Sequence, residues 1–213
     1  MIKTGLLSLI GLLSVILAPL AQSAPAKGFD AAAFDLAIAK VKQGDLSGDM
    51  KWLRQQNLIR FNYMPFLWWG DSKKAFDALK SEPANALKLA ETRLAENYID
   101  IEANFVAEHA LNALGRGAEA KLHHDLIVAW IASIKDGNDG QSSDKPWYAI
   151  SVDEEYLMFN FMGFKPGMQS LIKMDGHVFD KMDVTDTATG KSVTIWFNID
   201  FFFGKEGGDP GLK

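Results

Sequence analysis

The pattern of the apolar residues changes after Lys135, and that change constrains the fold more than any other feature of the sequence. Before it, apolar residues recur at helical spacing, as at Phe34, Ile38 and Val41. Near the carboxyl end, residues 193–199 alternate strictly between apolar and polar, which is the pattern of a strand with one buried face. Helices followed by strands in one chain are typical of an α+β fold.

The helical half contains a pair of helices with a distinctive spacing. Residues 98–134 have the pattern of a helix–turn–helix unit, with Gly115 and Gly117 between the helices and small side chains where the helices would cross closely. This spacing is similar to that of a tetratricopeptide repeat. No second clear copy is visible in the sequence, so we do not expect a long regular solenoid.

The last third of the chain predicts a β meander. The dipeptide Asp175-Gly176 joins the runs 169–174 and 178–184, and it is a strong signal for a two-residue hairpin turn. A second turn over 186–190 leads to the alternating run. The apolar face of such a sheet must be covered, and the helices are the available cover. We therefore predict an α+β fold of five or six helices, including the tetratricopeptide-like pair, packed with a small three-stranded antiparallel β meander.

A polar loop and a short helix are expected between these halves. Residues 136–145 are rich in Gly, Ser and Asp, and the apolar run 146–150 is compatible with a strand. Ser151 and Glu154 then have the spacing of a capping box, in which the serine accepts from the Glu154 amide and the glutamate bonds back. We expect a short helix from there to Gly163.

The first 23 residues have the pattern of a secretory signal peptide. Lys3 supplies a positive start, residues 5–18 are uncharged and mostly apolar, and Ala21 and Ser23 place small residues at the −3 and −1 positions. The apolar run is shorter than the roughly 20 residues that a membrane-spanning helix needs. We therefore predict cleavage after Ser23 in a bacterial protein that is periplasmic or secreted.

Composition limits the classes of function. The chain has no cysteine, which excludes disulfides, thiolate metal sites and cysteine nucleophiles. Its formal charge is −5, with Lys and Arg scattered, so nucleic acid is not an expected partner. No later segment is long and apolar enough to span a membrane. We expect one α+β domain over 24–203, with a helical part (24–135) and a β-rich part (146–203), followed by a flexible tail (204–213).

The segment from Phe61 to Trp69 is an irregular cluster of aromatic residues around Pro65. These rings could form a stacking platform for sugars or a groove for a peptide. They could also fill the core between the helical and β parts, where burial of each ring would contribute about 2 kcal/mol. We favour the core interpretation and leave the role of this segment open.

Several short runs of residues together form a pattern found in one known family: 136–140 (Asp-Gly-Asn-Asp-Gly), 147–156 (Trp-Tyr-Ala-Ile-Ser-Val-Asp-Glu-Glu-Tyr), 169–171, 175–177, 189–191 and 197–200. On these residues the sequence resembles the secreted bacterial proteins grouped as domain of unknown function 4919. The resemblance covers most of the predicted mature chain. It implies a tetratricopeptide-like helical part followed by a small β part. It implies no established activity and no catalytic residues.

The site expected from the residues lies where the segment 136–156 meets the hairpin turn. Its loops are polar, and the short helix presents free N–H groups. The predicted binding residues are Asp139, Ser142, Glu154, Glu155, Tyr156 and His177. The leading hypothesis is a non-catalytic periplasmic interaction or binding module for a protein or peptide partner in the cell envelope.

An enzyme is the alternative class, most plausibly a cell-envelope hydrolase that uses Glu154 or Glu155 with a histidine. We predict no cofactor and no metal site. The loop that starts at Asp136 fails the calcium-loop pattern, because its twelfth position is Trp147 rather than glutamate. The sequence also lacks a Gly-x-Ser-x-Gly serine-nucleophile motif, a phosphate-binding loop and a dinucleotide fingerprint.

Overall fold

The computed structural model describes residues 28–61 and 71–203. The predicted signal peptide, the aromatic segment after Phe61 and the predicted tail from 204 to 213 lie outside these residues. Within them, no helix is both long enough and apolar enough to cross a membrane.

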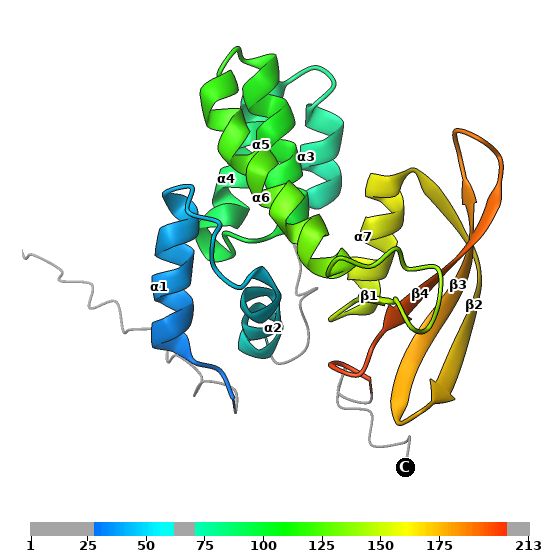
Figure 1. The fold of residues 1–213 in the computed structure, drawn as a ribbon. Helices are drawn as coiled ribbons and strands as arrows, with labels where there is room; N and C mark the ends of the chain where they lie inside the picture. Colours follow the sequence, from blue (N-terminus) through cyan, green and yellow to red (C-terminus); the bar gives the residue numbers. More distant parts are fainter. Residues whose placement is uncertain (1–27, 62–70, 204–213) are drawn as a thin grey trace, which may run out of the picture.

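Seven helices are present in the described ranges, and they gather in two groups with α7 apart from both (Figure 1). Asp30, Asp49 and Asp100 begin three of the helices, and each side chain accepts a hydrogen bond from an amide three residues on. The helices are α1 (Ala31–Lys42), α2 (Met50–Arg60), α3 (Ser72–Ala78), α4 (Pro83–Glu96), α5 (Ile101–Ala113), α6 (Gly117–Lys135) and α7 (Val152–Met162).

One four-stranded sheet follows, in the order β1-β4-β3-β2. The turn at Asp175 and Gly176 joins β2 to β3, and both residues have the positive φ angles (53° and 80°) that a tight hairpin turn of this kind requires. β4 pairs antiparallel with β3, whereas the short β1 pairs parallel with β4. The strands are β1 (Trp147–Tyr148), β2 (Phe164–Met174), β3 (His177–Asp186) and β4 (Ser192–Asn198).

The predicted α+β class is confirmed, but two details of the prediction are wrong. The described residues contain seven helices rather than five or six, and the sheet is four-stranded and mixed rather than a three-stranded antiparallel meander. The helix α3 has only seven residues, a length at which periodicity barely separates a helix from a turn. The strand β1 has two residues, and its partner β4 lies some fifty positions along the chain, so local pattern cannot reveal the pairing.

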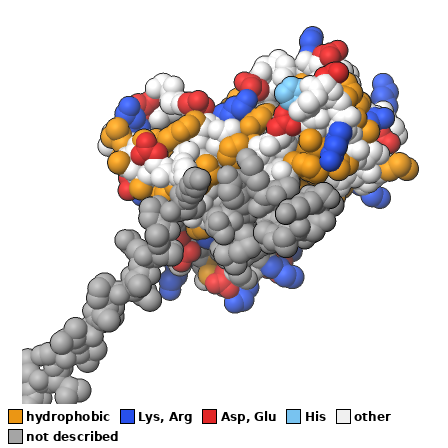
Figure 2. Space-filling view, turned by 90° about the horizontal axis from the view of Figure 1, so that it is seen from below, with side chains coloured by type: hydrophobic (Ala, Val, Ile, Leu, Met, Phe, Trp, Pro, Cys, Tyr) orange, Lys and Arg blue, Asp and Glu red, His pale blue; other side chains and the backbone are white. Residues whose placement is uncertain are grey.

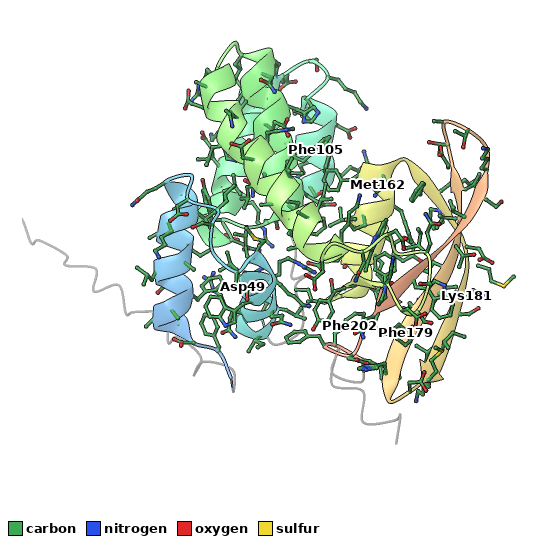
Figure 3. All side chains as sticks on the ribbon, viewed as in Figure 1. Asp49, Phe105, Met162, Phe179, Lys181 and Phe202 are labelled. Carbon is green, nitrogen blue, oxygen red and sulfur yellow. The ribbon has the colours of Figure 1, made fainter. Side chains whose placement is uncertain are left out.

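The helix α7 stands between the helical groups and the sheet (Figure 1). Its Met158 and Phe159 are fully buried in a core shared with the sheet residues Met182, Ile195 and Phe197. Side chains of α7 and the sheet fill the space between them (Figure 3). Because α7 packs on the sheet by one face, its other face and its first turn are turned towards the helices.

Candidate functional site

A cavity of about 220 Å³ opens where the first turn of α7 meets the helices. We call it the junction cavity. Its walls come from α2, from the end of α4 and the start of α5, from α6 and from α7. Five residues mark its extent, one from each of these elements: Arg54, Asn97, Glu102, Trp130 and Leu157.

A buried ion pair between α2 and α7 forms one wall. The Arg54 Nε and Nη2 atoms lie 2.9 and 2.5 Å from the two carboxylate oxygens of Glu154, a bidentate arrangement. Arg54 also donates to the Ser133 hydroxyl and to the Tyr148 carbonyl, both at 3.0 Å. Only 1% of the Arg54 side chain is exposed, so this guanidinium has its hydrogen bonds inside the protein.

The start of α7 differs in one respect from the predicted capping box. The Ser151 hydroxyl accepts from the Glu154 amide at 3.3 Å, as expected. The Glu154 carboxylate, however, accepts from the Ile150 amide at 3.0 Å and from Arg54, rather than bonding back to Ser151. The strong bidentate pair with Arg54 fixes the position of this carboxylate, and in that position it meets the Ile150 amide.

A second arginine of the cavity wall, Arg93, is also paired with a carboxylate. The Arg93 Nε atom on α4 lies 2.7 Å from the Asp100 carboxylate, and Arg93 is 4% exposed. The second oxygen of Asp100 caps α5 by accepting from the Ala103 amide at 3.0 Å. Both guanidinium groups of the junction cavity are therefore paired with carboxylates of the protein.

Two further carboxyl groups face the cavity without a cationic side chain of their own. Burial raises the pKa of Glu102, and the charges of Asp100 and Asp153 raise it further, while a hydrogen bond from the Ser72 hydroxyl at 3.0 Å and the nearby Arg93 act in the opposite direction. Burial also raises the pKa of Asp153. These two groups hold their protons more tightly than exposed carboxyls do, mainly because burial disfavours their charged form.

Two asparagines in the cavity wall have unused acceptors. The Oδ1 atoms of Asn57 and Asn97 are buried, and within the described residues no donor lies in hydrogen-bond reach of either. Asn97 is only 4% exposed. Buried polar atoms are nearly always hydrogen-bonded in proteins, so these two acceptors are exceptions. Neither oxygen is exposed to the cavity, so each amide would have to turn before it could meet a donor bound there.

The rest of the wall is apolar. Leu58, Ile101 and Trp130 contribute from the helices, and Ile150 and Leu157 contribute from the α7 side. Concave sites lined by apolar side chains with a few polar groups are typical of small-ligand pockets.

The structure separates the six predicted site residues into four places. Glu154 and Tyr156 line the junction cavity. Glu155, the next residue to Glu154 on α7, is fully buried on the side facing the sheet and hydrogen-bonds with Asp180 of β3. Neighbouring helical residues point about 100° apart, which explains why Glu154 and Glu155 cannot serve one site.

Asp139 and Ser142 belong to a loop that packs on the sheet. Asp139 accepts from the Gln141 amide at 2.9 Å, and the Ser142 carbonyl accepts from the Lys145 amide at 3.2 Å. The Gly140 carbonyl accepts from the Trp196 amide of β4 at 2.7 Å. These turns account for the Asp, Ser and Gly content of the loop. Neither Asp139 nor Ser142 lines the junction cavity.

His177 lies beside the hairpin turn and pairs with Asp200 at 2.5 Å. Burial alone would raise the pKa of Asp200, but the hydrogen bonds from His177, the Val178 amide and Asn198 together lower it. His177 is not among the residues that line the junction cavity.

The other three histidines lie on α5 and α6 and also have local partners. His109 contacts the Phe105 carbonyl at 2.9 Å, His123 contacts Asn104 at 2.7 Å, and His124 contacts Glu108 at 3.0 Å. None of them lines the junction cavity. In the described part of the chain, no group of three or more His, Asp or Glu side chains is placed to hold a metal ion.

Reasoning from the sequence missed most of this cavity. The strongest sequence signal for the cavity is Arg54. This charged residue lies beside Leu53 and within one helical turn of Leu58, and both leucines are buried. A charge on the buried face of a helix implies a buried partner. The contributions of Arg93, Asn97 and Glu102 could not be anticipated, because they depend on how α4 and α5 pack.

Fold and cavity together define an α+β protein with a pocket at the junction of its helices and its sheet. The sequence model of one family matches residues 72–205, and the description of that family is domain of unknown function (DUF4919). The chain belongs to this family, as the resemblance predicted. The matched range leaves out α1 and α2, and therefore Arg54. Comparisons with curated proteins and with solved structures found no match.

Proposed function

We propose that this chain is an exported, non-catalytic binding protein of the bacterial cell envelope, and that the junction cavity holds its ligand. The observation that carries the proposal is the cavity itself, about 220 Å³ in volume, whose wall combines apolar side chains with the carboxyl groups of Glu102 and Asp153. Concave, mainly apolar pockets with a few polar groups are the usual form of a ligand site. The ligand is a small molecule, or a side chain or chain end of an envelope peptide or protein.

Two finer parts of this proposal rest on the sequence. Export follows from the predicted signal peptide, and an intact mass that starts at Ala24 would support it, whereas a mass that includes Met1 would contradict it. The tetratricopeptide-like character rests on the spacing of the α5–α6 pair. Small side chains of this pair (Ala103, Ala107, Ala110 and Ala120) are buried in one core cluster with residues of α3 and α4. Such helix pairs commonly present surfaces to peptides.

The alternative of a hydrolase has less support from the geometry. A general acid or base must lie within hydrogen-bond reach of its substrate, and a Glu/His pair must therefore share one site. Within the described residues, Glu154 is paired with Arg54, and no histidine lines the junction cavity. On the face seen in Figure 2, acidic and basic side chains are interspersed, which also gives nucleic-acid binding no support.

Native mass spectrometry of the protein purified from its own envelope tests the proposed function. The wild type is expected to carry a bound small molecule, or to acquire one from a small-molecule extract of the envelope. Asn160→Trp places a large ring on the exposed side of α7 at the cavity wall and should abolish that adduct. Asn112→Trp makes the same change on an exposed part of α5 away from the cavity and should retain it. Equal adducts on both variants would contradict the proposal.

A further inference from the structure

The charged side chains of the junction cavity are unequal in number. Its lining includes two more carboxyl groups than guanidinium groups. Glu154 is paired with Arg54, and Asp100 is paired with Arg93. The two carboxyl groups left without a cationic partner are those of Glu102 and Asp153.

The surroundings of these two groups do not neutralise them. Glu102 accepts a hydrogen bond from the Ser72 hydroxyl, which carries no charge. The nearby Arg93 attracts Glu102 as well, but its guanidinium is paired directly with Asp100. Within the described residues, the Asp153 carboxyl makes no hydrogen bond or ion pair. The charge of Asp153 is close enough to act on Glu102, so the two groups repel each other.

The helix ends at the cavity offset part of this charge, but not all of it. The first turns of α5 and α7 both contribute to the wall. Each helix start acts as roughly half a positive charge, and the end of α4, which also lines the cavity, acts as roughly half a negative charge, so the three ends together supply about half a positive unit. Two ionised carboxylates carry more negative charge than this. The cavity is therefore electrostatically suited to a cation rather than to an anion.

The neutral polar groups point to the same kind of ligand. The unpaired Oδ1 atoms of Asn57 and Asn97, two residues of the cavity wall, are both acceptors, and a turn of either amide would bring its oxygen to the cavity. A primary ammonium group has three N–H donors and no acceptor, so it can satisfy amide oxygens and carboxylates together. An anion or an ether would add acceptors to a site that already has too many.

The apolar wall distinguishes an organic cation from a metal ion. Leu58, Ile150 and Leu157 offer no ligand atoms to a metal, but they can cover an alkyl stem. Tyr156, at 40% exposure, adds an aromatic ring of the kind that attracts cations. The volume of 220 Å³ equals that of about seven water molecules in the liquid, which is enough for a stem of several carbon atoms.

We infer that the ligand of the junction cavity carries a primary ammonium group on a short apolar stem. Glu102 and Asp153 receive the ammonium, and Leu58, Ile150 and Leu157 cover the stem. This inference rests on the proposed function, because it names the chemistry of the ligand for the same cavity. A free alkylamine and the amino terminus of a peptide share this chemistry.

Isothermal titration calorimetry with three probes of equal chain length tests the inference. Hexylamine is a cation, hexan-1-ol is neutral and hexanoate is an anion, while their stems are the same. The predicted mature protein should bind hexylamine at least about tenfold more tightly than either of the other probes. The double variant Glu102→Gln/Asp153→Asn keeps the shape of the wall and should remove that preference. A matched variant, Asp35→Asn/Glu91→Gln, changes the net charge equally at exposed positions outside the cavity and should retain it.

Several results would overturn the inference. Tighter binding of hexan-1-ol or hexanoate, lost in Asn160→Trp, would reject the ammonium while leaving the cavity as a binding site. Equal binding of hexylamine to Asn160→Trp and to the wild type would place the amine elsewhere. Failure of all three probes to bind would also contradict the inferred ammonium ligand. The proposed function would then be tested separately by native mass spectrometry.

A second pair of probes distinguishes the two sources of the ammonium group. Leucyl-glycyl-glycinamide has a free amino terminus on an apolar residue, and its N-acetylated form lacks the charge. Binding of the free peptide at least about tenfold more tightly than hexylamine would assign the site to a chain end. Tighter binding of hexylamine would assign it to a free amine. If the acetylated peptide bound as tightly as the free peptide, the ammonium would not be what the cavity recognises.

Discussion

At the scale of single residues, Arg54 is the side chain on which the junction depends most. Its guanidinium reaches Glu154 on α7, Ser133 on α6 and the Tyr148 carbonyl of β1, so it joins four elements. Removing one member of a buried ion pair leaves the other charge uncompensated. We therefore attribute the geometry of the cavity mainly to this residue.

Arg54→Met should lower the free energy of unfolding by about 3–5 kcal/mol, measured by urea denaturation. Arg54→Met/Glu154→Gln should recover part of this loss, because the second change removes the stranded charge. Arg116→Met is a matched control, since Arg116 pairs with Glu119 on the surface, and it should have a far smaller effect. A double variant as unstable as the sum of the two single variants would show that the pair is not coupled.

The Asp180 carboxyl is buried on the α7 side of the sheet. Its pKa shift determines in which direction the free energy of unfolding changes with pH. Burial raises its pKa, although hydrogen bonds from Gln169, at 2.7 Å, and with Glu155 act against that shift. A carboxyl whose pKa is raised on folding binds its proton more tightly in the folded state. The stability that it contributes is thus present at low pH and is lost as pH rises from about 4, the unfolded value, through its folded pKa.

Asp180→Asn should therefore become more stable relative to the wild type as the pH of the denaturation experiment rises across that window. The asparagine keeps an oxygen for Gln169 and offers an N–H to Glu155. Asp183→Asn, on the exposed face of the same strand, is the matched control. An Asp180→Asn advantage that is constant from pH 3 to pH 8 would show that this carboxyl does not titrate differently in the two states.

At the scale of elements, the loop between α6 and β1 packs so closely on Trp147 that position 140 has room only for glycine. Gly140 has a φ of 74°, and a Cβ atom placed on it would lie 2.8 Å from the Trp147 ring. Gly137, in the same loop, has a φ of 78° but has open space around it. An alanine at either position would therefore have an unfavourable positive φ, but only at position 140 would its methyl group also clash with the Trp147 ring.

Gly137→Ala should cost about 1 kcal/mol of unfolding free energy, because alanine disfavours a left-handed conformation. Gly140→Ala should cost about 1–3 kcal/mol more, because the added methyl group must displace the indole or the loop. Thermal unfolding of both variants provides the measurement. Equal losses of stability would mean that the contact with Trp147 is easily relieved.

Elements specified by neighbouring residues were predictable from the sequence, and elements specified by distant ones were not. The hairpin turn follows from Asp175 and Gly176, because both tolerate positive φ, and the structure places the turn there. The start of α7 follows from Ser151. The parallel pairing of β1 with β4 depends on the packing of the loop that precedes β1, which no local pattern encodes.

At the scale of the whole molecule, the candidate site was predictable only in part. Glu154 and Tyr156 were singled out because they open a short helix, and both line the junction cavity. Asp139 and His177 were singled out because polar turns often carry function, yet hydrogen bonds within the fold already involve them. The cavity forms where α2, α4, α5, α6 and α7 meet, so its position depends on contacts between distant parts of the chain.

The central claim is that the protein binds its ligand in the junction cavity, and methyl NMR tests it most directly. The predicted mature protein, with labelled isoleucine and leucine methyl groups, would be titrated with a small-molecule extract of the envelope. The account predicts that the largest chemical-shift changes fall on Ile101, Ile150 and Leu157, which line the cavity. Changes confined to the hairpin, for example at Leu171 and Ile172 of β2, would contradict it, as would the absence of any change.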